Sequence, residues 1–255
     1  MDIPLQPASL AGKAALVTGS SRGIGAATVG YLAAAGADVV VTYRNKAPRA
    51  EKVAAAAREH GVQALVVQSD LTDAASVEAM LQTAKDAFGG LDVLVMNASG
   101  GMESGLGEDY AMRLNRDAQV ALLEAAVPVL REGARIVFVT SHQAHFIRTV
   151  ETMPEYEAVA LSKRAGEDAL RERIVQLQAR GIDLVVVSGD MIEGTITATL
   201  LERANPGAIA GRREDAGRLY DVDEFAAEVA RAVVDPVPHD HTRLVGDVSG
   251  FQGQR

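Results

Sequence analysis

Apolar residues fall into short, mostly β-branched runs that alternate with longer Ala-rich amphipathic stretches. Continuous apolar runs are typical of strands covered on both faces of a sheet. The pattern predicts strands at Ala14–Thr18, Asp38–Thr42, Ala64–Gln68, Val93–Met96, Arg135–Thr140, Asp183–Val187 and Arg243–Val245. It predicts helices at Ile24–Ala35, Ala47–His60, Asp73–Phe88, Asp109–Arg131, Met153–Arg180 and Asp223–Val234. Strands alternating with helices indicate βαβ units. We therefore expect an α/β, single-domain Rossmann fold over residues 1–255, with a doubly wound parallel sheet of about seven strands flanked by helices.

Two segments interrupt this alternation, residues 141–151 and residues 188–218. Loops longer than about 12–15 residues are often functional. Both segments follow strands at the edge of the sheet where ligands bind in such folds. We expect a substrate loop and lid at about residues 188–218, with a short lid helix at Thr197–Asn205 and a hinge at Pro206-Gly207.

The segment 18–25, TGSSRGIG, joins the first strand to the first helix. Glycines at this point allow a tight turn, close backbone approach to a pyrophosphate and close packing of helix on sheet. The second strand ends in the segment 41–46, VTYRNK, without the acid that usually binds an NAD ribose. Arg44, Lys46 and Arg22 offer cations for a 2′-phosphate instead, so the sequence predicts NADP(H) as cofactor.

Composition narrows the function classes further. The net charge of −9 argues against a nucleic-acid or anionic-membrane surface. The 255 residues include no cysteine, which removes thiol chemistry and thiolate metal sites. His142 and His145 lack an acidic third ligand in a suitable register, so we expect no metal site. Without a signal sequence or an apolar run of about 18 residues, we expect a cytoplasmic protein that acts on a small molecule.

These motifs resemble the short-chain dehydrogenase/reductase family, and most of all its ketoacyl-carrier-protein-reductase-like branch. The glycine loop matches, and the family's Asn-Ala-Gly motif corresponds to residues 97–100, NASG, with a serine interposed. The resemblance implies hydride transfer between a nicotinamide and a carbonyl. It also implies a homodimer or homotetramer formed through the helices at 109–131 and 153–180. The positions that it assigns to cofactor binding are Gly19, Ser21, Arg22, Gly23, Ile24, Gly25, Tyr43, Arg44, Asp70, Leu71, Asn97, Ala98, Ser99, Lys163, Gly189, Ile192 and Thr195.

The same resemblance assigns catalytic roles. Ser141 would position the carbonyl oxygen, Lys163 would hold the ribose, and Asn115 would fix a water in the proton relay. The family's proton-donating tyrosine lies four residues before the lysine, and here that position is Val159. Valine cannot transfer a proton, so another group must do so if the chain is a reductase.

Two side chains are candidates for the missing proton donor. A capping box from Thr152 to Glu155 predicts that Tyr156 is helical. Seven residues of helix put Tyr156 on the face of Lys163 but about 10.5 Å along the axis, one turn too far unless a shifted substrate, a water or a π-bulge restores contact. The second candidate is His142, which adjoins Ser141 and titrates near neutral pH. Tyr156 could equally be a packing residue, and His142 a polar loop residue.

The loop after the sixth strand adds two acids, Asp190 and Glu193. They could bind an amine or hydroxyl of a substrate, act in acid–base catalysis, or face solvent. Three hypotheses follow for the whole chain. The first is an NADP(H)-dependent reductase of a ketone or imine on a small or polycyclic metabolite, with a non-standard proton donor. The others are a non-redox cyclase, dehydratase or isomerase on the same scaffold, and a catalytically silent NADP(H)-binding protein.

Overall fold

A seven-stranded parallel sheet forms the centre of the molecule, with strand order β3-β2-β1-β4-β5-β6-β7. The computed structural model describes residues 4–102, 105, 107 and 109–251. The strands are β1 (Ala14–Val17), β2 (Asp38–Tyr43), β3 (Ala64–Gln68), β4 (Leu91–Met96), β5 (Leu130–Ser141), β6 (Asp183–Gly189) and β7 (Thr242–Val245). The strand order reverses direction on either side of β1, so the expected doubly wound Rossmann fold is confirmed.

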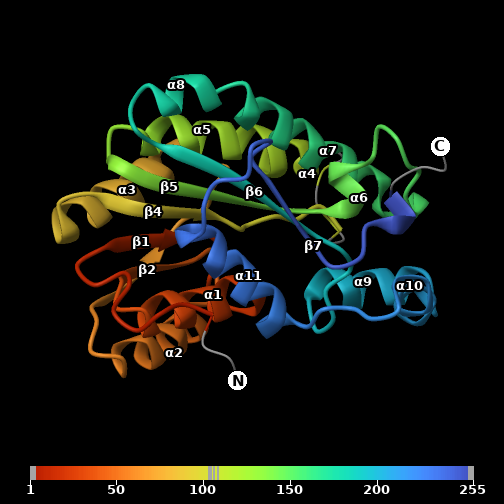
Figure 1. The fold of residues 1–255 in the computed structure, drawn as a ribbon, viewed down its shortest axis with the longest axis horizontal. Coiled ribbons are helices and arrows are strands. Elements are labelled where there is room, and N and C mark those ends of the chain that lie inside the picture. The colour runs from red at the N-terminus through yellow and green to blue at the C-terminus, as the bar shows by residue number, and fades with distance from the viewer. Residues whose placement is uncertain (1–3, 103–104, 106, 108, 252–255) are drawn as a thin grey trace.

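Helices cover both faces of the sheet (Figure 1). One face carries α1 (Gly23–Ala34), α2 (Ala47–Arg58) and α11 (Val222–Val234). The other carries α3 (Ala74–Phe88), α5 (Ala118–Ala126), α7 (Pro154–Arg171) and α8 (Ile174–Gln178). The short helices α6 (His142–His145), α9 (Ile196–Ala204) and α10 (Ala208–Ala216) gather at one end of the sheet.

Side-chain alternation along the strands produces two buried cores. In β1, Ala15 and Val17 face the core under α1, α2 and α11. Ala14 and Leu16 face the core under α3, α5 and α7. Because both faces of each central strand are buried, the strands are continuously apolar in sequence, which is why their positions could be predicted.

The predicted helix at 109–131 is wrong in its bounds. The structure divides it into α4 (Tyr110–Met112), a π-helical turn (Arg113–Asp117) and α5, and β5 begins already at Leu130. Pro128 explains the early end of α5, because proline has no backbone N–H to continue the hydrogen bonds of the helix. The predicted helix at 153–180 is likewise two helices, α7 and α8.

The segment 188–218 is more ordered than a loop. The expected lid helix is α9, and a further helix, α10, follows the left-handed Gly207 (φ 93°). The predicted capping box before α7 is wrong, since Met153 is the N-cap and no side chain caps this helix. Tyr156 is nevertheless helical, in the first turn of α7.

Candidate active site

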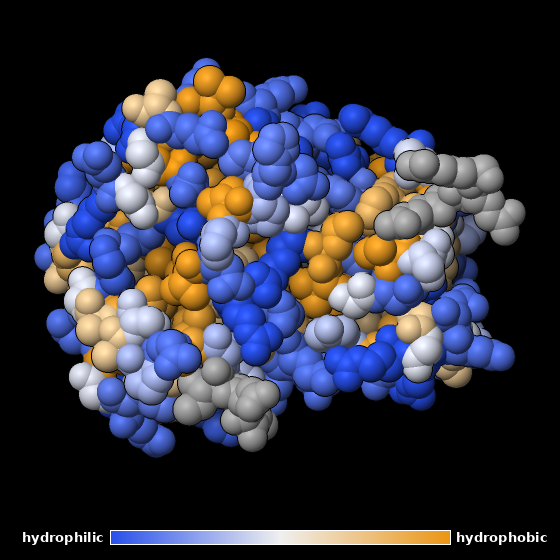
Figure 2. Space-filling model, in the orientation of Figure 1, coloured by the Kyte–Doolittle hydropathy of each residue, from blue (hydrophilic) through white to orange (hydrophobic). Residues whose placement is uncertain are grey.

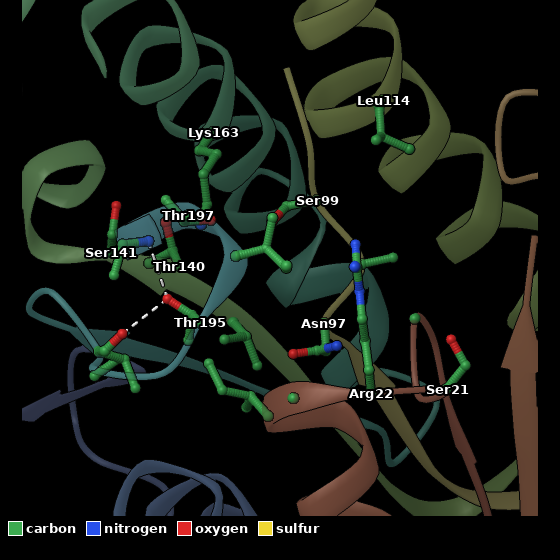
Figure 3. Close-up of a pocket in the computed structure, with 18 of the residues that line it drawn as sticks. Ser21, Arg22, Asn97, Ser99, Leu114, Thr140, Ser141, Lys163, Thr195 and Thr197 are labelled. Carbon is green, nitrogen blue, oxygen red and sulfur yellow. Dashed lines mark hydrogen bonds between the residues drawn. The ribbon is translucent and has the colours of Figure 1, made fainter. Parts of the chain in front are cut away.

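A cleft of about 590 Å³ opens at the end of the sheet where the strands finish. It is lined by the loop after β1, the ends of β2, β4, β5 and β6, the N-terminal half of α7 and the lid helix α9. Of the predicted cofactor residues, all but Gly25 and Gly189 line this cleft. In Figure 3, Ser141 and Lys163 lie on one side of the cleft, and Ser21, Arg22 and Asn97 lie on the other.

The loop after β1 brings its backbone to the cleft through glycine. Gly19 and Gly23 have positive φ angles of 65° and 57°, which residues with a side chain rarely adopt. A Cβ atom on Gly25 would lie 2.6 Å from Asn97 Nδ2 and 2.9 Å from the Gly19 carbonyl oxygen. Asn97 Nδ2 also donates to the Thr18 carbonyl oxygen at 2.9 Å. Gly25 and Asn97 therefore hold the loop in shape against α1.

Cations dominate the end of the cleft beyond β2. Arg22, Arg44, Lys46 and Arg49 all line it. Arg44 donates to the hydroxyl of Tyr110, a residue that sequence reasoning missed because no motif marks it. These side chains fit an anionic group such as a phosphate.

Asp70 is held within its own turn in the same part of the cleft. Its Oδ1 accepts from the backbone N–H and hydroxyl of Thr72, at 3.0 and 2.7 Å. Partial burial opposes ionisation, but these hydrogen bonds and the charge of Arg44 hold the pKa of Asp70 below its ordinary value. Asp70 is therefore a carboxylate whose backbone surroundings are fixed before any ligand binds.

The hydroxyl groups of Ser141 and Tyr156 lie 3.2 Å apart, within hydrogen-bonding distance. Ser141 is the last residue of β5, and its Oγ also accepts from the Ala144 backbone N–H at 3.3 Å. Both residues line the cleft, and Tyr156 is only 4% exposed. Tyr156 lies about one helical turn further from Lys163 than the family's tyrosine, and its hydroxyl nevertheless reaches Ser141.

Val159, at the family's usual tyrosine position, is not among the residues that line the cleft. It is buried in an apolar cluster with Tyr156, Met191 and Leu201. Its Cγ2 lies 3.2 Å from the place where a Cβ of Gly101 would be. The position therefore serves packing.

Lys163 lines the cleft from α7, and its neighbour Ser162 is bound to Asn115. The Asn115 side chain donates to the Gly100 carbonyl oxygen at 2.8 Å and to Ser162 Oγ at 2.9 Å, and does not line the cleft. The backbone carbonyl oxygen of Asn115, in the π-helical turn, lies 2.0 Å from the place where a Cβ of Gly166 would be. Only glycine at 166 lets the two elements approach so closely.

The structure does not bring His142 into the cleft. Its ring has no exposed surface and packs in T-shaped contacts against Phe146 and Phe251. Nδ1 lies 2.8 Å from Ser188 Oγ, and Nε2 lies 3.1 Å from the Val245 carbonyl oxygen. Burial lowers the pKa of His142 from 6.5 to about 4. The neutral ring ties α6 to β6 and β7.

Gly189 also serves packing, because a Cβ there would lie 2.3 Å from Phe225 Cε2. Thr195, at the start of α9, accepts from the Ala198 backbone N–H at 3.2 Å and donates to the Ile192 carbonyl oxygen at 2.8 Å (Figure 3). These two bonds fix the lid helix to the loop that precedes it.

Both acids of the substrate loop are paired with arginines of α10. Asp190 binds Arg212, with 2.8 Å between Oδ2 and Nη2. Glu193 binds Arg213, with 2.7 Å between Oε1 and Nη2. Gln143, which sequence reasoning missed, lines the cleft beside them and donates to Asp190.

The profile described as short chain dehydrogenase matches residues 13–205. The chain belongs to the short-chain dehydrogenase family. It is 30% identical to the short chain dehydrogenase/reductase AacuN of Aspergillus aculeatus over 263 aligned positions, which cover 100% of this chain and 95% of that protein.

Two solved structures extend this family assignment. A short-chain dehydrogenase from Burkholderia cenocepacia in complex with NADP superposes with a TM-score of 0.76 at 31% identity, covering 93% of this chain and 97% of the other. The angucycline C-6 ketoreductase LanV with bound NADP superposes with a TM-score of 0.74 at 28% identity, covering 89% and 91%.

Family membership makes this short-chain dehydrogenase an oxidoreductase by descent, and it supports a nicotinamide cofactor and a small-molecule substrate. Over the described part of the chain, no helix combines the length and apolarity needed to cross a bilayer. On the face shown in Figure 2, hydrophilic side chains predominate, and hydrophobic side chains are visible between them.

Proposed function

We propose that this chain is an NADPH-dependent reductase of ketones on polycyclic metabolites, with Tyr156 as the proton donor. The observation that carries the proposal is the 3.2 Å distance between Ser141 Oγ and the Tyr156 hydroxyl, in a cleft that Lys163 also lines. Two hydroxyls at hydrogen-bonding distance can both contact one carbonyl oxygen.

The cleft's donor groups suit NADP(H). The backbone of the loop at 18–25 and the N-terminus of α1 would hold the pyrophosphate. Arg44 and the neighbouring cations would hold the 2′-phosphate, and Lys163 would hold a ribose. When bound, the cofactor supplies the hydride that adds to the carbonyl carbon.

The chain's own residues would complete the reduction. Ser141 donates a hydrogen bond to the carbonyl oxygen and fixes its position. Tyr156 gives its hydroxyl proton to the oxygen as negative charge develops there, so that the product is an alcohol. The tyrosine then regains a proton from water. The lid helix α9, whose Ala198 and Leu201 line the cleft, would exclude bulk water during the step.

The substrate class follows from the walls near Ser141. Met191, Leu201 and the ring of Tyr156 belong to one apolar cluster at this end of the cleft. Apolar walls with a few fixed polar groups suit a hydrophobic ring system that carries a carbonyl. The similarity to a structure named as an angucycline ketoreductase supports this choice.

We also propose that the protein forms a homodimer or homotetramer in the cytoplasm. Light scattering would test the oligomeric state, and fluorescence microscopy of a tagged protein would test the location.

The test replaces Tyr156 with phenylalanine. With NADPH and the bicyclic ketone α-tetralone, Tyr156→Phe should lower kcat by about a hundredfold or more, because general acid catalysis contributes about 10²–10⁴-fold. NADPH affinity should be unchanged. Tyr31→Phe is the matched control, since the Tyr31 hydroxyl makes only a 3.4 Å contact with the Asp223 carbonyl oxygen.

Three results would contradict the proposal. If Tyr156→Phe keeps full activity, the proton comes from another group. If product forms while NADPH absorbance stays constant, the chain is a non-redox enzyme on this scaffold. If no ketone is converted but NADPH binds, the silent cofactor-binding hypothesis is favoured.

A further inference from the structure

A buried carboxylate at the end of β6 joins three segments around the substrate end of the cleft. Asp190 is 9% exposed and follows the last residue of β6. Its Oδ1 accepts from the Met191 backbone N–H at 2.8 Å, from Arg212 Nε at 3.0 Å and from Gln143 Nε2 at 3.2 Å. The Asp190 side chain thus connects the substrate loop, helix α10 and the helix α6 that follows Ser141.

The ion pair with Arg212 decides what Asp190 can offer to a ligand. Arg212 Nε lies 2.8 Å from Oδ2, and Nη2 lies 2.8 Å from the same oxygen. A guanidinium that spans both carboxylate oxygens compensates their charge. Asp190 is therefore not a site for a substrate cation, although its sequence position allowed that hypothesis.

The same carboxylate fixes the orientation of the Gln143 amide. A carboxylate paired with arginine only accepts hydrogen bonds, so the NH₂ group of Gln143 must face Asp190 and the carbonyl oxygen Oε1 must face the other way. Within the described part of the chain, no group donates a hydrogen bond to Oε1. Oε1 is not one of the buried polar atoms that lack a hydrogen-bond partner, so it is accessible to a ligand. Gln143 lines the cleft two positions after Ser141, so its small exposed surface, 8%, opens there.

We propose that Gln143 is a specificity-determining residue whose Oε1 accepts a hydrogen bond from a hydroxyl group of the substrate. The site would thereby select hydroxylated ring ketones over their deoxy analogues. Asp190 and Arg212 are positioning residues that keep the amide turned towards the cleft. The inference rests on the proposed ketone reduction, and it adds the polar group that the substrate carries besides the carbonyl.

The chemistry around Gln143 favours a neutral donor. An amide oxygen is a dipole without net charge, and the nearby acid is already compensated. The surrounding walls, Met191 and Tyr156, are apolar on the side where the substrate ring would lie. A hydrogen-bond acceptor in such a site discriminates between ligands with and without a hydroxyl group. A ligand that lacks the hydroxyl desolvates the acceptor without giving it a hydrogen bond.

The test compares α-tetralone with its isomers that carry one phenolic hydroxyl, each at a different ring position. Calorimetry measures their binding to the NADP⁺-loaded protein, so the readout does not need turnover. At least one isomer should bind about fivefold or more tightly than α-tetralone. Gln143→Leu, which has almost the same shape, should abolish that preference. With no acceptor left unpaired, α-tetralone should bind the variant about fivefold more tightly than it binds the wild type. Gln176→Leu, on the exposed face of α8, is the matched control.

The positioning role has its own arm. Arg212→Met should lower the hydroxyl preference towards unity, because Asp190 loses the contacts that hold both of its oxygens and can then turn away from the Gln143 amide. Arg212→Lys keeps a charge beside Asp190 and should restore most of the preference. A merely structural contribution of Arg212 would weaken the binding of all the tetralones equally, and this result would overturn its positioning role.

The outcomes separate this inference from the proposed function. If NADPH reduces the tetralones but no isomer shows a preference that Gln143→Leu removes, the inference is overturned and the reductase stands. If the preference is present and lost in Gln143→Leu while no tetralone is reduced, the ligand class stands and the reductase proposal is wrong. If none of the tetralones binds, the inference is overturned.

Discussion

The side of the cleft proposed for the cofactor centres on the backbone of the glycine loop, whereas the side proposed for the substrate is formed by side chains from separate segments. On the cofactor side, the glycine loop follows β1 directly. Gly25 leaves no room for a side chain beside Asn97, and Asn97 Nδ2 donates to the Thr18 carbonyl oxygen at 2.9 Å. On the substrate side, Tyr156 meets Ser141 across 15 residues of chain, and Gln143 meets Asp190 across 47. A short motif can encode the first kind of site, but the second depends on packing.

This difference predicts which kinds of substitution each side of the cleft should tolerate. A backbone site constrains glycine positions and leaves neighbouring side chains free. A site made of side chains depends on each partner's burial and protonation, as the contacts of His142 with Ser188 and Val245 illustrate. The predictions below test the two sides separately, starting with the largest expected effect.

The largest effect concerns His142, which is buried outside the cleft in the helix α6 that follows Ser141. Burial lowers its native-state pKa from 6.5 to about 4, so between these pH values the unfolded chain binds a proton that the native protein does not. The stability due to the neutral ring is present above pH 6.5 and is lost as the pH falls towards 4. The free energy of unfolding should therefore fall by about 3 kcal/mol more in the wild type than in His142→Gln over this range.

Urea unfolding at several pH values measures this difference. His60→Gln, in the exposed turn after α2, removes a histidine without a buried environment and serves as control. If wild type and His142→Gln lose stability in parallel, the ring is already charged in the native protein, and both ring nitrogens donate their hydrogen bonds.

The glycine positions of the loop after β1 could be predicted from sequence, because glycine is required where the loop has positive φ or packs closely against α1. Strand positions were equally readable, since both faces of the central strands are buried. Helix ends were harder to predict. The π-helical turn at Asn115 has no local sequence signal, and it packs closely on Gly166, which is distant in the chain. Tyr110 and Gln143 escaped prediction because their partners, Arg44 and Asp190, are distant in the chain.

The second prediction asks whether the family's usual tyrosine can be restored. Val159 packs in an apolar cluster and its Cγ2 approaches Gly101 closely, so Val159→Tyr should overpack the site and destabilise the protein by about 2 kcal/mol. The ring should not reach the cleft, and the double variant with Tyr156→Phe should remain inactive. Thermal unfolding and NADPH oxidation measure the two effects, with Val175→Tyr at a 76% exposed position as control. Recovery of activity in the double variant would show that both helix positions can serve the site.

The third prediction concerns the backbone side. Gly25→Ala places a methyl group against Asn97 and the Gly19 carbonyl, which should shift the loop and weaken NADPH binding by about twentyfold. Gly30→Ala, in the same helix, has open space around the new methyl group and should keep NADPH affinity while stabilising α1 by up to about 1 kcal/mol. Titration of NADPH fluorescence compares the variants. Equal affinity in both would mean that the loop adapts, and that the close contact at Gly25 is not required for binding.

The smallest effect tests a side chain that acts on the backbone side. Arg44 is exposed at the cation-lined end of the cleft and is held by Tyr110, so Arg44→Gln should weaken NADPH binding by only about fivefold, as solvent screens an exposed ion pair. NADH lacks the 2′-phosphate, and its affinity should not change. Lys52→Gln removes the same charge from α2 outside the cleft and controls for the overall field. An equal loss for both cofactors would mean that Arg44 acts by holding Tyr110 in place, so that even the cofactor side would depend on a side-chain contact between distant segments.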